Sequence, residues 1–199
     1  MQPTGLAVTS TEPRAAAPDA PAAPALTLAA ATRGVRRPAL PSSTGRPSVI
    51  RPATTVDVDS VLDLADDLYQ EDGSVPFVRE SAAMALRELL THADLGRVWV
   101  VDEAAGVIGY LALTWGFSLE FHGRDAFVDE VFVAPSHRGR GLGSQLLEAA
   151  EAACRAHGAR ALHLAVERSN RRAHELYVRA GFREHDRYLM TKRLDEEAD

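Results

Sequence analysis

Cysteine is nearly absent from this chain of 199 residues, and its scarcity excludes several classes of protein. Cys154 is the only cysteine, so no internal disulfide is expected. The seven histidines show no His-x-x-x-His spacing and have no paired cysteines, so no metal site is expected either. No stretch approaches the roughly 20 apolar residues of a membrane-spanning helix. We therefore expect a cytoplasmic protein without a membrane partner.

Two common phosphate-binding fingerprints are also missing. A glycine-rich turn, Arg138-Gly139-Arg140-Gly141-Leu142-Gly143, follows an apolar strand, but no lysine follows its glycines. This excludes the phosphate loop of nucleoside-triphosphate enzymes. The Gly-x-Gly-x-x-Gly pattern of dinucleotide enzymes fails in both registers, because its last glycine falls on Ser144 or on Leu146. The pattern that remains is Arg-x-x-Gly-x-Gly.

The residues present at this turn nevertheless favour an anion site. Glycines between a strand and a helix let a ligand approach the backbone closely. The first N–H groups of a helix have no intrahelical acceptor and carry partial positive charge. A polyphosphate group would therefore fit over residues 138–144, beside a strand that contains the acids Asp129 and Glu130. A turn that merely links a strand to a helix would have the same composition.

Composition divides the chain into three parts. Residues 1–47 are rich in Ala, Pro, Thr and Ser and bury too little apolar surface to fold, so we expect a disordered extension. Residues 48–194 are long enough for one globular domain with a hydrophobic core. Residues 195–199 form an acidic tail.

Hydrophobic periodicity predicts alternating strands and helices within the folded part. Cys154 follows Leu146 and Ala150 at four-residue spacing, which favours a core position over a reactive thiol. The order predicts a mixed α/β sheet with helices on both faces. The expected strands are 48–52, 97–102, 107–115, 125–133, 161–166 and a final strand or hairpin at 182–194; the expected helices begin near Thr55 and span 78–91, 141–157 and 170–180.

A second motif lies downstream of the turn. Asn170 is followed by Ala173, by Leu176-Tyr177 and by Gly181-Phe182. Together with Arg138-x-x-Gly141-x-Gly143, this arrangement resembles the GCN5-related N-acetyltransferase (GNAT) superfamily. Residues 117–125 resemble its Hpa2-like, polyamine-acetyltransferase-like branch. The resemblance covers about residues 48–194 and implies the GNAT fold, a mostly antiparallel sheet whose central strand splays from the next strand to form a cofactor cleft.

The resemblance also implies acetyl-CoA as co-substrate. In relatives the pantetheine arm pairs with the central strand and the pyrophosphate lies over the glycine turn. The cofactor-binding residues implied in this way are Val131, Phe132, Val133, Arg138, Gly139, Arg140, Gly141, Leu142, Gly143, Ser144 and Asn170. For Asn170 a simple helix cap remains the alternative role.

Acetyl transfer requires a proton acceptor and a proton donor. An amine attacks only when neutral, so a carboxylate must take its proton, and Asp129 and Glu130 are the candidates, with Glu130 slightly preferred. Adjacent strand residues face opposite sides unless a bulge intervenes, so we expect one of the two to face the acceptor. The family pattern assigns Tyr177 as the acid that protonates the departing thiolate. For Asp129 and Glu130 the alternative is an acid at the end of a strand, in solvent or in an ion pair, and for Tyr177 it is a packed aromatic.

The expected function is direct transfer of an acetyl group from acetyl-CoA to a primary amine of a small molecule, or to an exposed lysine or N-terminus. A protein acetyltransferase and a non-catalytic acyl-CoA-binding sensor remain alternatives. No nucleic-acid partner is expected, and many relatives form homodimers. Acidic residues near the acceptor region favour a cationic acceptor, although an ordinary solvated helix face explains several of them equally well. These acids are Asp66, Asp67, Glu71, Asp72, Glu120 and Asp125.

Overall fold

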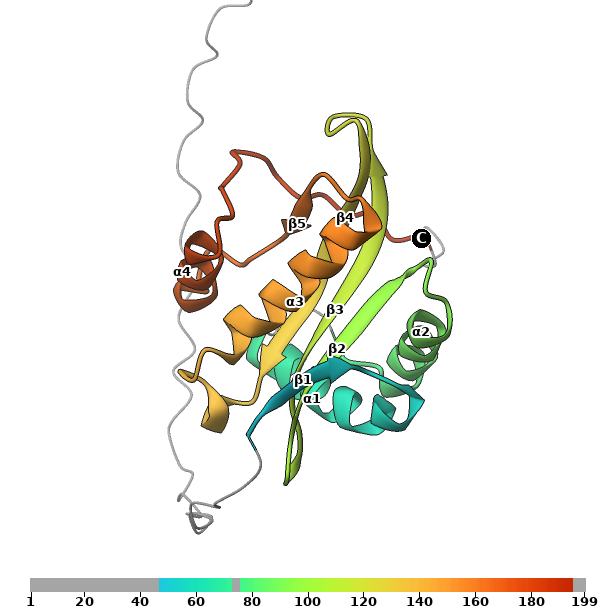
Figure 1. Ribbon diagram of the computed structural model, residues 1–199, viewed down its shortest axis with the longest axis vertical. Coiled ribbons are helices and arrows are strands. Elements are labelled where there is room, and N and C mark those ends of the chain that lie inside the picture. The colour runs from blue at the N-terminus through green and yellow to red at the C-terminus, as the bar shows by residue number, and fades with distance from the viewer. Residues whose placement is uncertain (1–46, 73–75, 195–199) are drawn as a thin grey trace, which may run out of the picture. The chain divides into compact units, whose positions relative to one another are not determined.

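The computed structural model describes residues 47–72 and 76–194 (Figure 1). The extension predicted for residues 1–47 and the tail at 195–199 lie outside the described residues, except for Pro47. The strands are β1 (Val49–Pro52), β2 (Gly96–Glu103), β3 (Gly106–Ser118), β4 (Gly123–Val133) and β5 (Leu162–Leu164). The helices are α1 (Val58–Asp72), α2 (Arg79–Thr91), α3 (Leu142–His157) and α4 (Arg171–Arg179), with short 3₁₀ turns η1 (Thr55–Asp57) and η2 (Pro135–His137).

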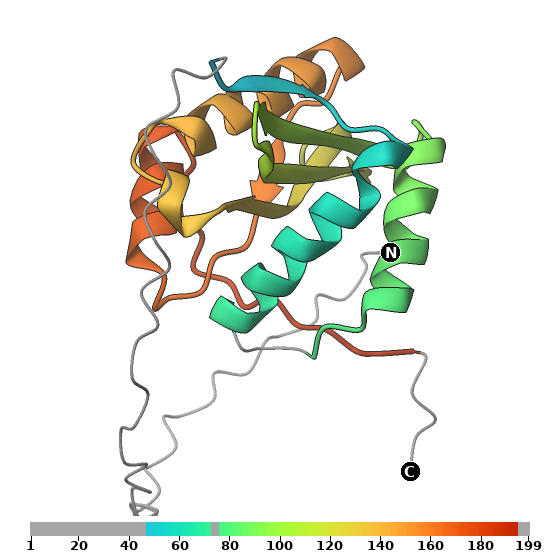
Figure 2. The same ribbon diagram turned by 90° about the horizontal axis from the view of Figure 1, so that it is seen from below.

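The strands form one sheet in the order β1-β2-β3-β4-β5. Neighbouring strands are antiparallel except for β4 and β5, which run parallel. Helices α1 and α2 cover one face of this sheet and α3 covers the other (Figure 2). The predicted α/β architecture, mostly antiparallel with helices on both faces, is confirmed.

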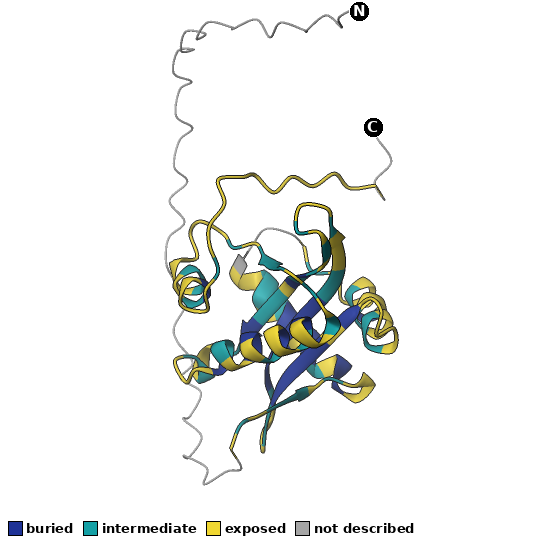
Figure 3. Ribbon diagram, turned by 45° about the horizontal axis from the view of Figure 1, so that its top comes forward, coloured by how far each residue is buried: buried dark blue, intermediate teal, exposed yellow. Residues whose placement is uncertain are grey.

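Alternation along β3 divides the core between the two faces. Leu111 and Leu113 are fully buried against the apolar stripe of α3. Tyr110 points to the opposite face, where it packs with residues of α1 such as Val61. The buried residues therefore lie along the middle strands, and the outer surfaces of the helices are exposed (Figure 3). This is the period-two pattern expected of a strand that is covered on both sides.

Cys154 lies on the buried face of α3 with 4% of its surface exposed. Burial raises the pKa of its thiol to about 11, so the reactive thiolate is scarce at neutral pH. The core position predicted for this cysteine is confirmed. Helix α3 ends at His157, as predicted, and the residue that follows it, Gly158, has a φ of 76°, a left-handed conformation that favours glycine.

The central strand β4 separates from β5 along part of its length. The two strands pair only from Ala126 opposite Leu162 to Val128 opposite Leu164. Beyond Val128, β4 continues to Val133 with β3 on one side and no paired strand on the other among the described residues. The backbone of Val131–Val133 is therefore available on the β5 side. This is the splayed arrangement that the family resemblance implies.

Two predicted strands differ from the structure. The strand expected at 161–166 is limited to Leu162–Leu164, because the chain leaves β4 after that point. The strand or hairpin expected at 182–194 is wrong, since no strand is formed there and residues 183–194 are all exposed. An alternating sequence pattern indicates which face of a strand is apolar, but it does not show which strand will pair with it. Here the neighbouring strand would be β5, which has only three residues and therefore few backbone groups to bond residues 182–194.

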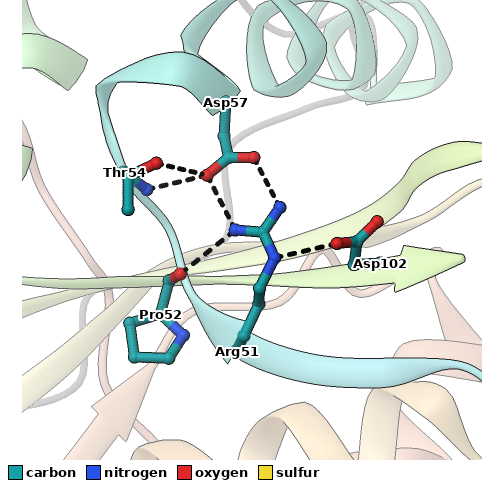
Figure 4. Close-up of polar contacts among 5 residues, drawn as sticks. All are labelled: Arg51, Pro52, Thr54, Asp57 and Asp102. Carbon is teal, nitrogen blue, oxygen red and sulfur yellow. Dashed lines mark hydrogen bonds and ion pairs between the residues drawn. The ribbon is translucent and has the colours of Figure 1, made fainter.

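The start of α1 is fastened to the sheet by a cluster of charges (Figure 4). Asp57, only 4% exposed, accepts bonds of 2.7 and 2.9 Å from the guanidinium of Arg51. The same carboxylate accepts from the backbone N–H of Thr54 at 2.8 Å, and Arg51 also bonds Asp102 on β2 at 2.9 Å. The cluster therefore connects β1, β2 and the first turn before α1.

We expect Asp57→Ala to lower the free energy of unfolding by about 3 kcal/mol, because it leaves a partly buried guanidinium without its main partner. Asp59→Ala is the matched control: its carboxylate is exposed and 3.9 Å from Arg79, so we expect a change within about 0.5 kcal/mol. The Arg51 hydrogen bond lowers the pKa of Asp57 to about 2. The contribution of the ion pair is therefore full above about pH 4 and is lost as the pH falls through 2. Equal urea-unfolding midpoints for the two variants would contradict this role.

Candidate active site

The glycine-rich turn connects β4, through η2, to the start of α3. Gly139 and Gly141 have φ angles of 83° and 78°, which side chains with a Cβ rarely adopt. An added Cβ would meet no atom within 4 Å at Gly139, and at Gly141 only the Gln145 amide nitrogen at 3.9 Å. The space beside the turn is therefore open. Since the first N–H groups of α3 have no acceptor within the helix, the turn supplies free donors for an anion.

A cavity of about 470 Å³ lies against this turn. It is bounded by the unpaired end of β4, the first turn of α3 and helix α4. Most of the predicted cofactor residues and the predicted catalytic tyrosine line this one cavity. They are Val131, Phe132, Val133, Arg138, Gly139, Gly141, Leu142, Gly143, Ser144, Asn170 and Tyr177. The predicted residues Asp129, Glu130 and Arg140 are not among those that line it.

Asn170 and Tyr177 reach the cavity from the two ends of α4. Asn170 is the N-cap of this helix: its side-chain oxygen accepts the Ala173 N–H at 3.0 Å. Asn170 therefore caps α4, and it also lines the cavity. Tyr177 is 9% exposed, its ring packs edge-on against Phe182 at 5.9 Å, and burial raises the pKa of its hydroxyl. The hydroxyl therefore remains protonated at neutral pH.

Arg138 lines the cavity, and its side chain is 24% exposed. Its Nε donates to the Val133 carbonyl at 2.7 Å, and its Nη2 contacts both carboxylate oxygens of Glu71, on α1, at 2.9 Å. The guanidinium also stacks over the Phe132 ring, 5.0 Å from its centre. Arg138 therefore ties the glycine turn and the end of β4 to α1.

The Arg140 side chain lies outside the cavity, and its predicted role in cofactor binding stays a prediction. Its Nη2 donates to Glu103 at 2.7 Å and to the Ser48 hydroxyl at 3.0 Å, at the ends of β2 and β1. Glu103 also accepts from Ser48 at 2.6 Å and lies 3.8 Å from the His137 ring. The Arg140 side chain thus anchors the turn at the ends of β1 and β2 instead of lining the cavity, because the half-buried carboxylate of Glu103 binds its guanidinium.

The two candidate bases lie at a bulge in β4. Ala112 on β3 is opposite Glu130, but its neighbour Leu113 is opposite Val128, so Asp129 is the extra residue. Asp129 is exposed as a whole residue, but partial desolvation of its carboxyl raises the pKa of that group. Glu130 is half-buried and accepts a hydrogen bond from the Tyr110 hydroxyl at 2.8 Å. Burial raises the pKa of Glu130, the bonds from Tyr110 and Tyr69 lower it, and the charge of Asp129 raises it.

Several acids of the expected acceptor rim have basic partners. Glu71 pairs with Arg138, and Glu120 pairs with Arg187 at 3.0 Å. Asp125 lies 3.4 Å from the His163 ring. The side chain of Asp72 lies outside the described residues. The rim therefore carries less free negative charge than its composition indicates.

The cavity also has lining residues that the sequence analysis did not assign to the cofactor. Two arginines of α4 reach it, Arg172 and Arg179, which are seven residues apart and share a helix face. Because Asn170 and Tyr177 are also seven residues apart, the same helical spacing could have identified the two arginines as candidate site residues. The remaining ones are Leu68, Glu71, His137, Ala173 and Leu176.

Neither a metal site nor a membrane helix is found within residues 47–72 and 76–194. No three His, Cys, Asp or Glu side chains there are grouped so that they could hold a metal ion. No helix in these ranges combines the length and the apolar character needed to cross a membrane.

The sequence model of the acetyltransferase (GNAT) family matches residues 58–182, which include β4, the glycine turn and α4. The chain belongs to this family. The acetyltransferase is 31% identical over 145 residues to the aminoalkylphosphonate N-acetyltransferase of Salmonella typhimurium, covering 73% of this chain and 90% of that enzyme. It is therefore an acetyl-CoA-dependent N-acetyltransferase. The branch within the superfamily remains a prediction.

Solved structures share the fold of this acetyltransferase. An integron cassette protein from a salt-marsh metagenome is 36% identical, with a TM-score of 0.65 over 74% of this chain and 91% of that one. An aminoglycoside N-acetyltransferase in complex with CoA aligns with a TM-score of 0.64 over 78% of this chain and 99% of that one. At 20% identity, this second likeness concerns the fold alone.

Proposed function

We propose that this acetyltransferase moves the acetyl group of acetyl-CoA directly to the primary amine of a small molecule. The observation that carries the proposal is one cavity of about 470 Å³ that is lined by the glycine turn, the unpaired end of β4, Asn170 and Tyr177 together. Family membership supplies the reaction class, and the cavity with its unpaired strand edge supports acetyl-CoA as the co-substrate.

The cavity fits acetyl-CoA by its chemistry. The free N–H groups at the start of α3 suit the pyrophosphate, and Arg172 and Arg179 add positive charge to the same cavity. The backbone of Val131–Val133 has no strand partner on the β5 side, so an extended pantetheine arm can pair with it. A free N–H of this strand would also polarise the thioester carbonyl. Arg140 is not needed as a phosphate ligand in this arrangement.

The reaction then needs two proton transfers. The neutral amine nitrogen attacks the thioester carbonyl carbon and forms the N–C bond, and Glu130 takes the excess proton from nitrogen, directly or through water. The C–S bond breaks, and the Tyr177 hydroxyl gives its proton to the thiolate sulfur. The products are the acetylated amine and free CoA. Glu130 is preferred over Asp129 because Tyr110 holds its carboxylate in a fixed position.

The acceptor class follows from two observations. The Salmonella relative is named for aminoalkylphosphonates, which are small primary amines that carry an anionic group. The ion pairs of Glu71 and Glu120 reduce the negative charge that would favour a polycation. We therefore propose a small primary amine and regard the cationic acceptor as the weaker expectation. A homodimer also remains a prediction.

The test is release of CoA from acetyl-CoA, read with a thiol reagent, in the presence of single amines. The panel contains 2-aminoethylphosphonate, spermidine, an aminoglycoside, free amino acids and a lysine peptide. We expect turnover with at least one small amine, and mass spectrometry should show its N-acetylated product. Turnover with the peptide alone would support a protein acetyltransferase instead. Tight acetyl-CoA binding without any turnover would support the sensor and contradict our proposal.

A further inference from the structure

Glu130 lies on the face of the sheet opposite the α3 core. It is separated by one residue from Phe132, which packs with Tyr110 and with Val61 of α1. Val131, the residue between them, packs with the core on the α3 side. Because the bulge ends at Asp129, the regular alternation of β4 resumes at Glu130. The carboxylate is therefore on the α1 face, while the neighbouring valines line the cofactor cavity.

Tyr110 reaches Glu130 along a diagonal of the sheet. Tyr110 is directly opposite Phe132, two residues beyond Glu130 on the same face of β4. The residue directly opposite Glu130 is Ala112, whose short side chain leaves the hydroxyl of Tyr110 room to approach. The ring of Tyr110 is 1% exposed, so its direction is fixed by the core. The 2.8 Å bond to Glu130 Oε2 is thus made by a donor that has little freedom to move.

A second tyrosine reaches the same carboxylate from a helix. Tyr69 on α1 hydrogen-bonds the Glu130 side chain, and its ring packs against Phe77 with centres 5.4 Å apart. Donors from β3 and from α1 therefore meet at one acid on β4. Neither tyrosine lines the cofactor cavity, so neither is expected to touch acetyl-CoA.

We propose that Tyr110 and Tyr69 are positioning residues that hold the Glu130 carboxylate at the β4 bulge in the orientation needed to accept the proton of the amine. This inference rests on the proposed role of Glu130 as base and adds two residues to it. A carboxylate that accepts from two hydroxyl donors keeps further lone pairs for the amine or for a water. Burial raises the pKa of Tyr110 further, so this hydroxyl remains a donor throughout the working range.

The arrangement also sets the pH at which the base works. The groups that act on Glu130 are Tyr110 from β3, Tyr69 from α1 and Asp129 from β4 itself. Both tyrosine bonds stabilise the ionised carboxylate, whereas burial and Asp129 destabilise it. Removing a tyrosine hydroxyl should therefore raise the pKa of Glu130, and activity, which requires the ionised form, should begin at higher pH.

The first experiment measures kcat/KM against pH for Tyr110→Phe and Tyr69→Phe, with the fastest amine of the panel at saturating acetyl-CoA. We expect the acidic limb of the profile to move up by about one pH unit in Tyr110→Phe. The free energy of a hydrogen bond to a charged group corresponds to a pKa change of about that size. We expect plateau turnover to fall about tenfold. Tyr188→Phe is the matched control, because Tyr188 is 88% exposed, and it should match the wild type.

The second experiment needs no acceptor. Carbon-13 NMR of protein labelled at glutamate carboxyls follows the titration of Glu130, identified as the resonance missing from Glu130→Gln. The Glu130 titration should move to higher pH in both tyrosine variants and stay in place in Tyr188→Phe. An unmoved titration, with only a lower melting temperature, would make both tyrosines packing residues and overturn the inference.

Glu130→Gln separates this inference from the proposed function. If Glu130→Gln abolishes the acidic limb while both tyrosine variants keep it in place, Glu130 is the base but the tyrosines do not position it. If the limb survives in Glu130→Gln, the base assignment itself is wrong, and the positioning inference is wrong with it.

Discussion

Replacing Gly141 with valine is expected to abolish measurable acetyl-CoA binding. Gly141 has a φ of 78°, and a β-branched residue is strained there. The new side chain would also enter the open space beside the turn, where we place the pyrophosphate. We expect the dissociation constant, measured by calorimetry, to rise at least about 100-fold, which corresponds to about 2.8 kcal/mol.

Gly158→Val provides the control for this loss. Gly158 ends the same helix α3, has nearly the same φ of 76°, and would likewise place a Cβ in open space. The two substitutions therefore strain the backbone equally. Gly158, however, lies at the end of α3 that is far from the glycine turn. We expect Gly158→Val to lower the melting temperature as much as Gly141→Val but to bind acetyl-CoA normally. Equal affinities in the two variants would refute the turn as the pyrophosphate site.

Replacing Tyr177 with phenylalanine is expected to lower kcat by about 100-fold or more while sparing acetyl-CoA affinity. The substitution keeps the ring that packs against Phe182 and removes only the hydroxyl. Loss of a general acid typically costs between about 100-fold and 10,000-fold. Because burial raises the pKa of Tyr177, ionisation of this hydroxyl should not lower the activity of the wild type near neutral pH.

The control for Tyr177→Phe is the dissociation constant of acetyl-CoA in the same variant. Our account expects it to change by less than about twofold, since the hydroxyl acts on the departing sulfur rather than on binding. A parallel loss of affinity and kcat would instead identify Tyr177 as a packing residue of the cavity wall.

The parts of the site that the sequence predicts well are those determined by short-range geometry. The glycine-rich turn can be found from the sequence because the positive φ angles of Gly139 and Gly141 are a local property of the turn. Asn170 and Tyr177 are brought to one cavity because a helix places residues seven apart on one face. In both cases the partners lie within one element or one turn.

The parts that the sequence misses depend on distant partners. Arg140 turns away from the cavity because Glu103 and Ser48, far away in sequence, accept its hydrogen bonds. The bulge that separates the roles of Asp129 and Glu130 is a register shift between two strands, which no single strand encodes. The segment 182–194 has the composition of a strand but no ladder partner among the described residues. The sequence pattern places Tyr110 among the buried residues of its strand. Its hydrogen bond to Glu130 depends on the pairing of β3 with β4, so the sequence alone does not predict it.

The most direct test of the central claim is a crystal structure of this acetyltransferase with acetyl-CoA bound. Our account predicts the pyrophosphate against the N–H groups of residues 139–144, the pantetheine arm along Val131–Val133, and the thioester sulfur within hydrogen-bond reach of the Tyr177 hydroxyl. Density for acetyl-CoA in another part of the molecule, or a thioester remote from both Tyr177 and the β4 bulge, would contradict it.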